Sequence, residues 1–515
     1  MFTARTPPQN IDRLRLEAEY YDPAKLAALR WMETWRSRLV SLADLCDYIT
    51  DGTHVTPSYV DSGVHFLSST NINSCSISFD DTKFITPEEH ASLGKAKCNP
   101  APGDVLLAKN GKIGTAAVYR KHHPSCSLFV SVALLRDVRR LDRDYLAAFL
   151  NSSAGWNQFA RSSKTGVITN LHLEEIREVS VPEPARAVQV YIGSKVRQAD
   201  LLSQYCRGLV EAIGHHFQFL TDGYSSRPKA WRTQSHLLDS YRANPTHYDP
   251  VVLRMLSDAP KKVKLLELGS LLGQRGMSGG ATPLGAVYGN AGVFFVRVQN
   301  VKPYRLDLSD AAYLSPDQDE LLKRSRCAAE EVILSITGYP GTVSLVMEED
   351  LPLNINQHCV RFDVRSPYDP AYVVAAMNCP FVKRQVERLA IGGTREALDY
   401  PSVYSLLVPM LDDRTMEAVA DQVRTLNMAD RSSKRLVTVA KILSEALVEG
   451  RVAECEIVEA QQAIDNGDYT ADRQLLARLT QDGVDIDGSP KLIHDSDALY
   501  RTLNSAEGPS PLEAK

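Results

Sequence analysis

Two long stretches of the chain carry apolar side chains at steps of three and four residues, which is the pattern of an amphipathic helix. The first runs from Ala185 to Leu220 without a proline, and the second runs from Arg414 to roughly Val452. Charged residues fill the positions between the apolar ones in both stretches. We therefore predict two long helices that bury their apolar stripes against each other as an antiparallel pair.

A different pattern precedes each predicted helix. From about residue 40 to residue 184, short β-rich runs such as DVLLA and AAVY alternate with turn signals such as DGTH and KNGKIG. Aromatic and apolar residues at helical spacing follow in DRDYLAAFLNSSAGWNQF. This order predicts a compact α+β unit in which strands come first and helices follow.

The first half of the chain recurs in the second half at an offset of 227 residues. YYDPAKL, beginning at Tyr20, returns as HYDPVVL, beginning at His247, and the glycines of KNGKIG match those of TGYPG at the same offset. GVHFLSSTNI at Gly63 matches GVFFVRVQNV at Gly292 two residues out of this register, and the difference is absorbed before Gly338. A period of this size is far longer than a solenoid unit, so it predicts two homologous domains in tandem.

These patterns divide the chain into five parts. We expect a first domain over residues 1–184, a long helix with a linker over 185–246, a second domain over 247–411 and a second long helix over 412–463. The remaining residues, 464–515, combine a short helical stretch with acidic and Pro/Ser-rich segments. We expect them to form a small, partly disordered extension.

Composition narrows the class of protein. The chain has 515 residues, of which 44% are hydrophobic, enough for several buried cores. It has no apolar run of about 18 residues and its N-terminal segment is polar, so we expect a cytoplasmic protein. Nine scattered cysteines without a C-x-x-C pair predict reduced thiols rather than a disulfide framework or a zinc knuckle. The net charge of −5 decides nothing about partners, because a basic face can coexist with an acidic whole.

Two common catalytic motifs are missing from the sequence. No G-x-x-x-x-G-K-[ST] phosphate loop and no Asn/Asp-Pro-Pro-aromatic tetrapeptide occurs. Two groups of possible metal ligands are expected to be ordinary surface or helix residues. The carboxylates follow Pro316 at a predicted helix start: Asp317, Asp319 and Glu320. The histidine pairs lack acidic or cysteine partners at ligand spacing: His122-His123 and His215-His216.

The glycine-hinged turn KNGKIG is the strongest positive signal. Gly111 and Gly114 can take positive φ angles, and the turn is expected to project its two lysines and its asparagine from a β-rich edge. The second copy has Thr337 and Tyr339 in place of basic residues. A constant frame with different tips is typical of related modules with different ligands, although hairpin geometry alone also accounts for the glycines.

DGTHVTP from Asp51 to Pro57, the GDVLLAKNGKIG block and TGVITNL before the first long helix, together with the tandem repeat, resemble the specificity (S) subunit of type I restriction-modification systems. The resemblance covers about residues 12 to 460. It implies two target-recognition domains that each read half of a split DNA sequence, held apart by an antiparallel coiled coil. It also implies a non-catalytic chain whose partners are two methyltransferase subunits, which use S-adenosylmethionine, and restriction subunits, which use ATP and Mg²⁺.

Polar loop residues are the expected DNA contacts under this resemblance, because bases are read by Arg or Lys on guanine and by Asn or Gln on adenine. The first domain offers His54, Ser69, Asn71, Lys109, Asn110, Lys112 and Lys164. The second domain offers Arg275, Arg297, Gln299, Asn300, Thr337, Tyr339 and Arg395. Since the two sets differ, an asymmetric bipartite site is expected.

Three alternatives remain open at this point. The chain is a recognition subunit of another phage-defence or modification assembly, which the extension beyond about residue 460 suggests. It is a stand-alone nuclease or methyltransferase with an unrecognised site. It is a scaffold whose domains bind proteins, in which case binding would ignore salt, whereas DNA binding weakens steeply as salt rises.

Overall fold

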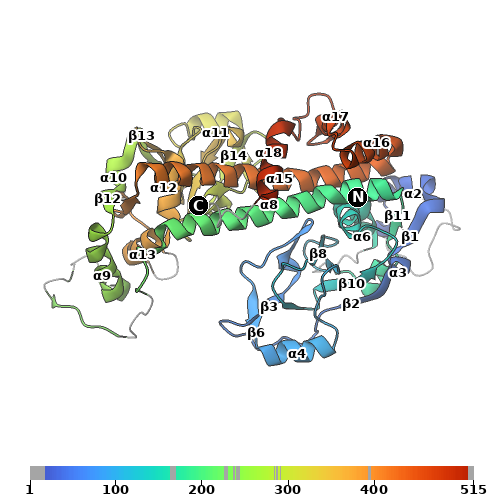
Figure 1. Ribbon diagram of the computed structural model, residues 1–515, viewed down its shortest axis with the longest axis horizontal. Helices are drawn as coiled ribbons and strands as arrows, with labels where there is room; N and C mark the ends of the chain where they lie inside the picture. Colours follow the sequence, from blue (N-terminus) through green and yellow to red (C-terminus); the bar gives the residue numbers. More distant parts are fainter. Residues whose placement is uncertain are drawn as a thin grey trace. The chain divides into compact units, whose positions relative to one another are not determined.

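The computed structural model describes residues 18–162, 170–224, 230–235, 238, 244–283, 285, 288–289, 291–392 and 396–508 (Figure 1). The described residues fall into two compact units. The first unit combines the chain up to Ser203 with residues 431–507, and the second unit comprises residues 204–430. Each unit contains one of the two sequence repeats.

The first unit contains a module built on two small sheets. A four-stranded antiparallel sheet has the order β2-β10-β7-β8, and a three-stranded sheet has the order β6-β3-β9, with β3 and β9 parallel. A two-stranded pair, β1-β11, closes the module, which we call the first module (residues 39–182). The strands are β1 (Leu39–Ser41), β2 (Cys46–Asp51), β3 (Val64–Leu67), β4 (Ile72–Asn73), β5 (Ser76–Ile77), β6 (Lys83–Ile85), β7 (Val105–Ala108), β8 (Ala116–Val118), β9 (Cys126–Leu128), β10 (Val132–Val138) and β11 (Ser180–Pro182).

The core strands explain why the sequence runs are apolar rather than alternating. All four residues of β7 and all three of β8 are buried, because side chains on both faces of these strands meet protein. The run LFVSVALL, which resembles a single strand, instead belongs to two strands. Its first residue ends β9 and its last four lie in β10, and Val132 N–H donates to the Phe129 carbonyl in the turn between them.

Helices cover the strands and end the module. Asp142 caps α5 by accepting from the backbone N–H groups of Asp144 and Tyr145, which compensates two donors of the first helical turn. The buried Tyr145 hydroxyl donates to the Pro182 carbonyl of β11 and so ties α5 to the module's exit. The helices before the long one are α1 (Pro23–Ala27), α2 (Trp31–Thr34), α3 (Leu42–Leu45), α4 (Pro87–Lys95), α5 (Arg143–Asn151), α6 (Ser153–Ser162) and α7 (Leu173–Arg177).

The second unit repeats this architecture. Its sheets have the orders β13-β21-β18-β19 and β17-β14-β20, with β14 and β20 parallel, and the pair β12-β22 closes what we call the second module (residues 264–410). The strands are β12 (Lys264–Glu267), β13 (Leu272–Gly279), β14 (Val293–Val296), β15 (Val301–Lys302), β16 (Arg305–Leu306), β17 (Ala312–Leu314), β18 (Val332–Ser335), β19 (Val343–Leu345), β20 (Leu353–Ile355), β21 (Cys359–Val364) and β22 (Leu407–Met410). The helices are α9 (Pro250–Asp258), α10 (Leu268–Leu271), α11 (Pro316–Leu321), α12 (Pro370–Asn378), α13 (Pro380–Leu389) and α14 (Tyr400–Tyr404).

The 227-residue offset extends to individual hydrogen bonds. Tyr372 of α12 donates to the Pro409 carbonyl, as Tyr145 does to Pro182 in the first module. The same strand orders and the same buried bonds confirm the predicted tandem duplication of an α+β domain.

The two predicted long helices are α8 (Arg186–Gln218) and α15 (Asp413–Val448). Ser433 of α15 donates to the Ala199 carbonyl of α8, and Cys206 of α8 donates to the Leu426 carbonyl of α15, so the two helices run antiparallel, as predicted. The helix expected over residues 412–463 consists of two helices. Gly450 has a φ of +73°, and the N–H groups of Arg451 and Val452 return to the Ala446 carbonyl, which ends α15.

The C-terminal extension is folded as far as the structure describes it. It begins at Glu454 rather than at the expected residue 464. It contains α16 (Glu454–Asp465), α17 (Thr470–Arg478), the short pair β23 (Leu479–Thr480) and β24 (Gly483–Val484), and α18 (Ser496–Glu507). The expected partial disorder of this segment stays a prediction, because its last residues, 509–515, lie outside the described residues. Within the described chain, no helix has the length and apolar character needed to cross a membrane.

Candidate nucleic-acid interface

The turn between β7 and β8 in the first module has the conformation that its glycines predicted. Gly111 and Gly114 have φ angles of +70° and +78°. A Cβ on Gly114 would lie 2.4 Å from the Phe159 ring of α6, so the turn packs against this helix at a distance that only glycine permits. Nothing lies within 4 Å of the corresponding point on Gly111. The tip of the turn is therefore open, while its base is fixed to α6.

Lys109 does not project from this turn, contrary to expectation. Its side chain is only 8% exposed, and its Nζ lies 2.5 Å from Oδ2 of Asp51, the last residue of β2. His54 Nε2 lies 3.3 Å from the other oxygen of the same carboxylate. The Asp51 carboxylate thus joins the DGTH segment to the glycine turn, and it neutralises the lysine that we had assigned to DNA.

The remaining tip residues differ in exposure. Lys112 is exposed, and no described residue pairs with its ammonium group. Asn110 is partly buried and forms an isolated β-bridge with Asn170. Lys164, the last candidate in this part of the first module, lies outside the described residues.

Lys112 lines a cleft of about 550 Å³ between the turn and α6. Trp156 of α6 is 49% exposed and forms another wall. Lys25 of α1 completes it, with its Nζ donating to the Ala160 carbonyl at 3.0 Å. The cleft thus combines an open aromatic surface with two ammonium groups.

Two of the three predicted asparagines, Asn71 and Asn300, each stabilise a backbone turn. Asn71 is buried, and its Oδ1 accepts from the Ser68 N–H at 2.9 Å. Asn300 is fully buried and accepts from the Arg297 N–H at 3.0 Å in the second module. Each forms the same capping arrangement at a 3₁₀ turn. Because both residues are buried and their amide oxygens are occupied, these side chains are not available to bases in this conformation.

The neighbours of these asparagines are more accessible. Ser69 is partly buried, and its N–H donates to the Ser131 hydroxyl. Gln299 is exposed, and its amide oxygen accepts from the Arg297 guanidinium, which also donates to the Asp310 carbonyl at 2.8 Å. Gln299 is therefore the better-placed candidate of this turn.

The turn between β18 and β19 in the second module has the same frame. Gly338 and Gly341 have φ angles of +86° and +89°, and a Cβ on Gly341 would lie 2.9 Å from Val386 of α13. Tyr339 at the tip is 77% exposed. Thr337 is partly buried and bridges to Ala397, while Arg395 lies outside the described residues. The frame is thus constant between the modules, and the chemistry of the tip differs.

Arg275 lies in β13 and pairs with a buried carboxylate rather than projecting from an open loop. It lies 2.8 Å from Glu331, which also pairs with Arg361 at 3.1 Å. Burial raises the pKa of Glu331, and the two guanidinium groups oppose this rise. The exposed fraction of the Arg275 side chain is 42%, so one face of the group remains accessible.

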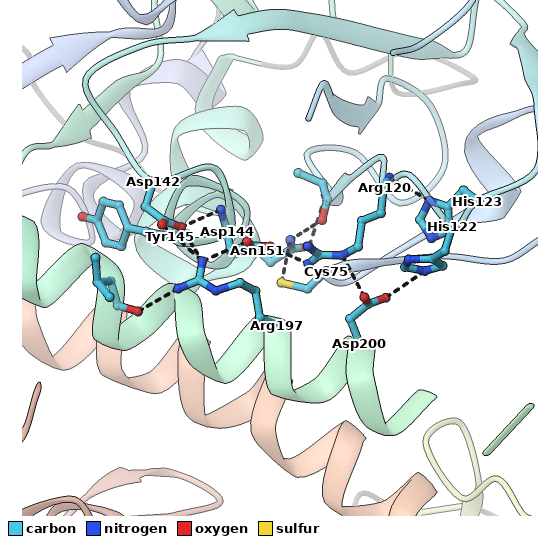
Figure 2. A network of polar contacts seen from close by, with 12 residues as sticks. Cys75, Arg120, His122, His123, Asp142, Asp144, Tyr145, Asn151, Arg197 and Asp200 are labelled. Atoms are coloured by element: carbon cyan, nitrogen blue, oxygen red, sulfur yellow. Dashed lines mark hydrogen bonds and ion pairs between the residues drawn. The ribbon is translucent and has the colours of Figure 1, made fainter. Parts of the chain in front are cut away.

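The sequence patterns missed the contacts that hold each module on a long helix. In the first unit, Arg197 of α8 binds both oxygens of Asp142 at 3.1 Å and Asp144 at 3.0 Å (Figure 2). Arg120 binds Asp144 and lies 3.1 Å from Asp200 of α8. The guanidinium of Arg197 therefore clamps the N-terminus of α5 to α8.

The second unit has the same clamp. Arg424 of α15 binds the two oxygens of Asp369 at 2.9 and 3.0 Å, and Asp369 caps α12. Burial disfavours the charged form of Arg424, but hydrogen bonds to Asp369 and Glu330 outweigh it and raise its pKa. The clamping residues obey the 227-residue offset, so aligning the two halves for charged positions would have identified them.

His122 has a carboxylate neighbour that sequence spacing did not indicate. Its Nε2 lies 3.5 Å from Oδ1 of Asp200, and Figure 2 shows the two side chains facing each other. Among the described residues, His122, His123 and Asp200 form the one group of three potential metal ligands, with ligand atoms within 4.8 Å of one another. The positive charge of the Arg120 guanidinium beside Asp200 disfavours a metal cation at this group. The backbone N–H of Arg120 already donates to His123 Nδ1.

The carboxylates after Pro316 do start a helix, α11, as expected, but one of them is not solvated. Asp319 is 5% exposed, accepts from the Asn354 amide and pairs with Arg326. It fixes α11 to β20. His215 and His216 lie on α8, which agrees with the expectation of helix histidines.

A buried charge pair anchors the C-terminal extension within the first unit. Asp472 of α17 is fully buried, and Lys195 of α8 lies 2.6 Å from its Oδ1. Tyr191 and Tyr500 donate to the same carboxylate. Burial would raise the pKa of Asp472, but Lys195 and the tyrosine hydroxyls outweigh it and lower the pKa.

No protein-family model matches the sequence, and no curated protein matches it. Solved structures similar to the chain include the S subunit of a type I restriction-modification system from M. genitalium, 11% identical, covering 80% of this chain and 94% of that chain with a TM-score of 0.35. The HsdS subunit from Thermoanaerobacter tengcongensis is 15% identical and covers 84% of this chain and 97% of that chain with a TM-score of 0.25.

Proposed function

We propose that the chain is the DNA sequence-specificity subunit of a type I restriction-modification complex and catalyses no reaction itself. In this proposal each module reads one half of a bipartite, asymmetric DNA site. The long helices bind two methyltransferase subunits, which carry S-adenosylmethionine, and the complex is completed by restriction subunits that use ATP and Mg²⁺.

One observation carries the proposal: a duplicated module whose frame is constant and whose tip chemistry is not. Three features recur at equivalent positions in both units: the glycine turns, the asparagines that cap a 3₁₀ turn, and the arginine clamps. The exposed tip residue is Lys112 in one and Tyr339 in the other. A duplicated enzyme would retain its reactive groups, whereas a duplicated reader retains its scaffold and varies its loops.

Eight of the predicted DNA-contacting residues are described and remain accessible for contact with bases or phosphates. In the first module they are His54, Ser69, Asn110 and Lys112. In the second they are Arg275, Gln299, Thr337 and Tyr339. Lysine and arginine contacts to phosphate position the duplex, and amide or guanidinium contacts to base edges supply the sequence preference.

The experiment is single-molecule sequencing of adenine methylation in the native host, compared with a strain that lacks only this chain. We expect the deletion strain to lose one split, asymmetric methylated motif, which would give both half-sites and the spacer together. An unchanged methylome would contradict the modification role.

A second assembly remains a candidate because of the extension anchored by Asp472. A recognition subunit of another defence or modification complex would use the same modules, and this extension would bind its additional partner. Purifying the complex with the intact chain and identifying its subunits separates the two. Incubating the purified chain alone with DNA, Mg²⁺ and S-adenosylmethionine tests the stand-alone enzyme, since turnover without partners would exclude a non-catalytic subunit.

A further inference from the structure

Each glycine turn lies beside one exposed aromatic residue and one lysine, at equivalent positions in the two modules. In the first module, the turn carries Lys112 and the adjoining helix α6 carries Trp156. At the same 227-residue offset, the turn of the second module carries Tyr339 and helix α13 carries Lys383. Each module thus pairs one aromatic side chain with one cation at the same two positions, and the two types have exchanged places.

The backbone makes these positions neighbours in both modules. Gly114 brings the first turn against Phe159 of α6, and Gly341 brings the second turn against Val386 of α13. Trp156 precedes Phe159 by three residues and Lys383 precedes Val386 by three, so each lies on the helix face next to the turn. The exchange therefore keeps an aromatic surface and a positive charge beside the same hinge.

The side chains at these positions are exposed to solvent. Trp156 is 49% and Tyr339 is 77% exposed, and Lys383 is exposed as well. Large aromatic side chains that remain open next to a cation offer a stacking surface and a charge within one cleft. Within the described residues, Lys112 and Lys383 form no ion pair that would use that charge internally.

We infer that the cleft beside the first glycine turn, and the equivalent surface beside the second, each bind an unstacked nucleotide of DNA, whose base stacks on the aromatic ring and whose phosphate is bound by the lysine. This chemistry is that of single-stranded nucleic-acid sites, where an aromatic platform and a basic groove act together. A paired base cannot stack on a side chain from the groove, so the ligand must be a nucleotide displaced from the helix or in a single strand. The volume of about 550 Å³ in the first module is sufficient for one nucleotide. The inference deepens the proposed function and rests on it.

The test uses the full chain and hexathymidylate, a short single strand with no duplex. Binding stoichiometry is measured by titration calorimetry. Tryptophan fluorescence, measured in a Trp231→Phe background because Trp231 is only partly buried, reports the first cleft, since Trp31 and Trp35 are buried. We expect two oligonucleotides per chain and quenching of Trp156. Trp156→Leu and Tyr339→Leu should each remove one site, and the double variant both, because losing a stacked base weakens binding about tenfold or more.

Matched variants separate the cleft from folding and from general charge. Trp156→Phe keeps a stacking ring, so it should retain two sites while losing the fluorescence change. Lys112→Ala should weaken the first site and reduce its salt dependence by about one counterion. Lys95→Ala changes an exposed lysine on α4, away from the cleft, and should leave both sites unchanged.

The outcome is distinguishable from that of the proposed function. Unaltered stoichiometry in Trp156→Leu, or no quenching in the parent chain, would overturn the inference even if the methylome shows a split motif. Conversely, loss of sites in the variants together with an unchanged methylome would leave the nucleotide clefts standing and remove the type I role.

Discussion

The hydrogen-bond partners of a polar residue decide whether it is available to DNA, and the two lysines of the first glycine turn show this. Lys112 is exposed, whereas Lys109 is held by Asp51 with both side chains nearly covered. A buried pair contributes little net stability when intact, but removing one partner leaves an uncompensated charge. The two lysines therefore have opposite expected phenotypes.

We predict that Lys109→Met lowers the free energy of unfolding by about 3–5 kcal/mol, because Asp51 then remains buried without its cation. Lys112→Ala should change it by no more than about 0.5 kcal/mol, as expected for an exposed side chain. Urea unfolding of both variants measures this difference. If Lys109→Met is as stable as the parent chain but binds DNA more weakly, then Lys109 contacts DNA.

Two histidines of the first module predict a pH dependence. Burial lowers the pKa of His65, which contacts the Thr82 hydroxyl, and of His90, which contacts the Ser127 hydroxyl. The folded state then binds a proton less readily than the unfolded chain, whose histidines titrate near 6.5. Their contribution to stability is therefore present above pH of about 6.5 and is lost as pH falls through the lower folded pKa.

We expect the melting temperature of the parent chain to fall between pH 7 and pH 5 by more than that of a His65→Gln, His90→Gln double variant. The difference between the two curves isolates these histidines from the other titrating groups. Thermal melts at several pH values measure it. Parallel curves would show that the two imidazoles titrate alike in the folded and unfolded chain.

At the scale of elements, the arginine clamps hold the start of a module helix on a long helix. Arg197 bonds to Asp142, which already caps α5, so one carboxylate serves both the cap and the clamp. Removing the guanidinium leaves the partly buried carboxylates of Asp142 and Asp144 with fewer cationic partners. The loss should therefore appear locally, in the first turn of α5, before it appears in global stability.

We predict that Arg197→Ala increases hydrogen exchange in residues 143–146 and lowers the melting temperature by several degrees, as expected for a loss of about 1–3 kcal/mol. Arg186→Ala is the matched control, since Arg186 also approaches Asp142 but is 63% exposed and 3.8 Å away. Exchange coupled to mass spectrometry measures the effect. Equal exchange in the two variants would mean that the clamp does not order α5.

Two carboxylates hold the C-terminal extension: Glu454 of α16, which binds Arg38 and accepts from the Ala185 N–H, and the buried Asp472 of α17. Asp472 gathers Lys195 and two tyrosine hydroxyls in a fully buried site, and its removal would leave the Lys195 ammonium, which is 1% exposed, without its partner. We predict that Asp472→Ala destabilises the docking of α16 to α18 by about 3–5 kcal/mol. Limited proteolysis should then cut residues 454–508 while leaving the modules intact. Asp482→Ala, at an exposed turn, should show the parental pattern.

The elements themselves could be predicted from sequence because their signals are local. Apolar steps of three and four identified α8 and α15, and the positive-φ glycines identified both hairpin turns. The partners of Lys109 and Asp472 could not be predicted, because Asp51 lies 58 residues from the lysine and Lys195 lies 277 residues from the aspartate. The type of turn predicts that its polar side chains are exposed. Whether a side chain is buried depends on the residues that distant segments of the chain place beside it.

For the whole molecule, the duplication is the strongest constraint, and it sets the form of the functional test. If each module reads its own half-site, a change in one tip must alter one half of the recognised motif and leave the other half unchanged. A protein-binding scaffold or a stand-alone enzyme has no reason to show this independence. The half-sites therefore provide an internal control within one experiment.

We predict that replacing Thr337 and Tyr339 by the residues at the matching positions of the first module, Asn110 and Lys112, changes the second half-site of the methylated motif alone. The frame tolerates the exchange because the turn glycines occupy equivalent positions with similar φ angles. Base contacts contribute about 1–3 kcal/mol each, so the altered module should relax or change its preference by roughly tenfold or more per base pair. Methylome sequencing of a strain carrying this variant measures both halves together. A simultaneous change in both halves would mean that the modules do not read DNA independently, and a motif unchanged in both would move the readout away from the glycine turns.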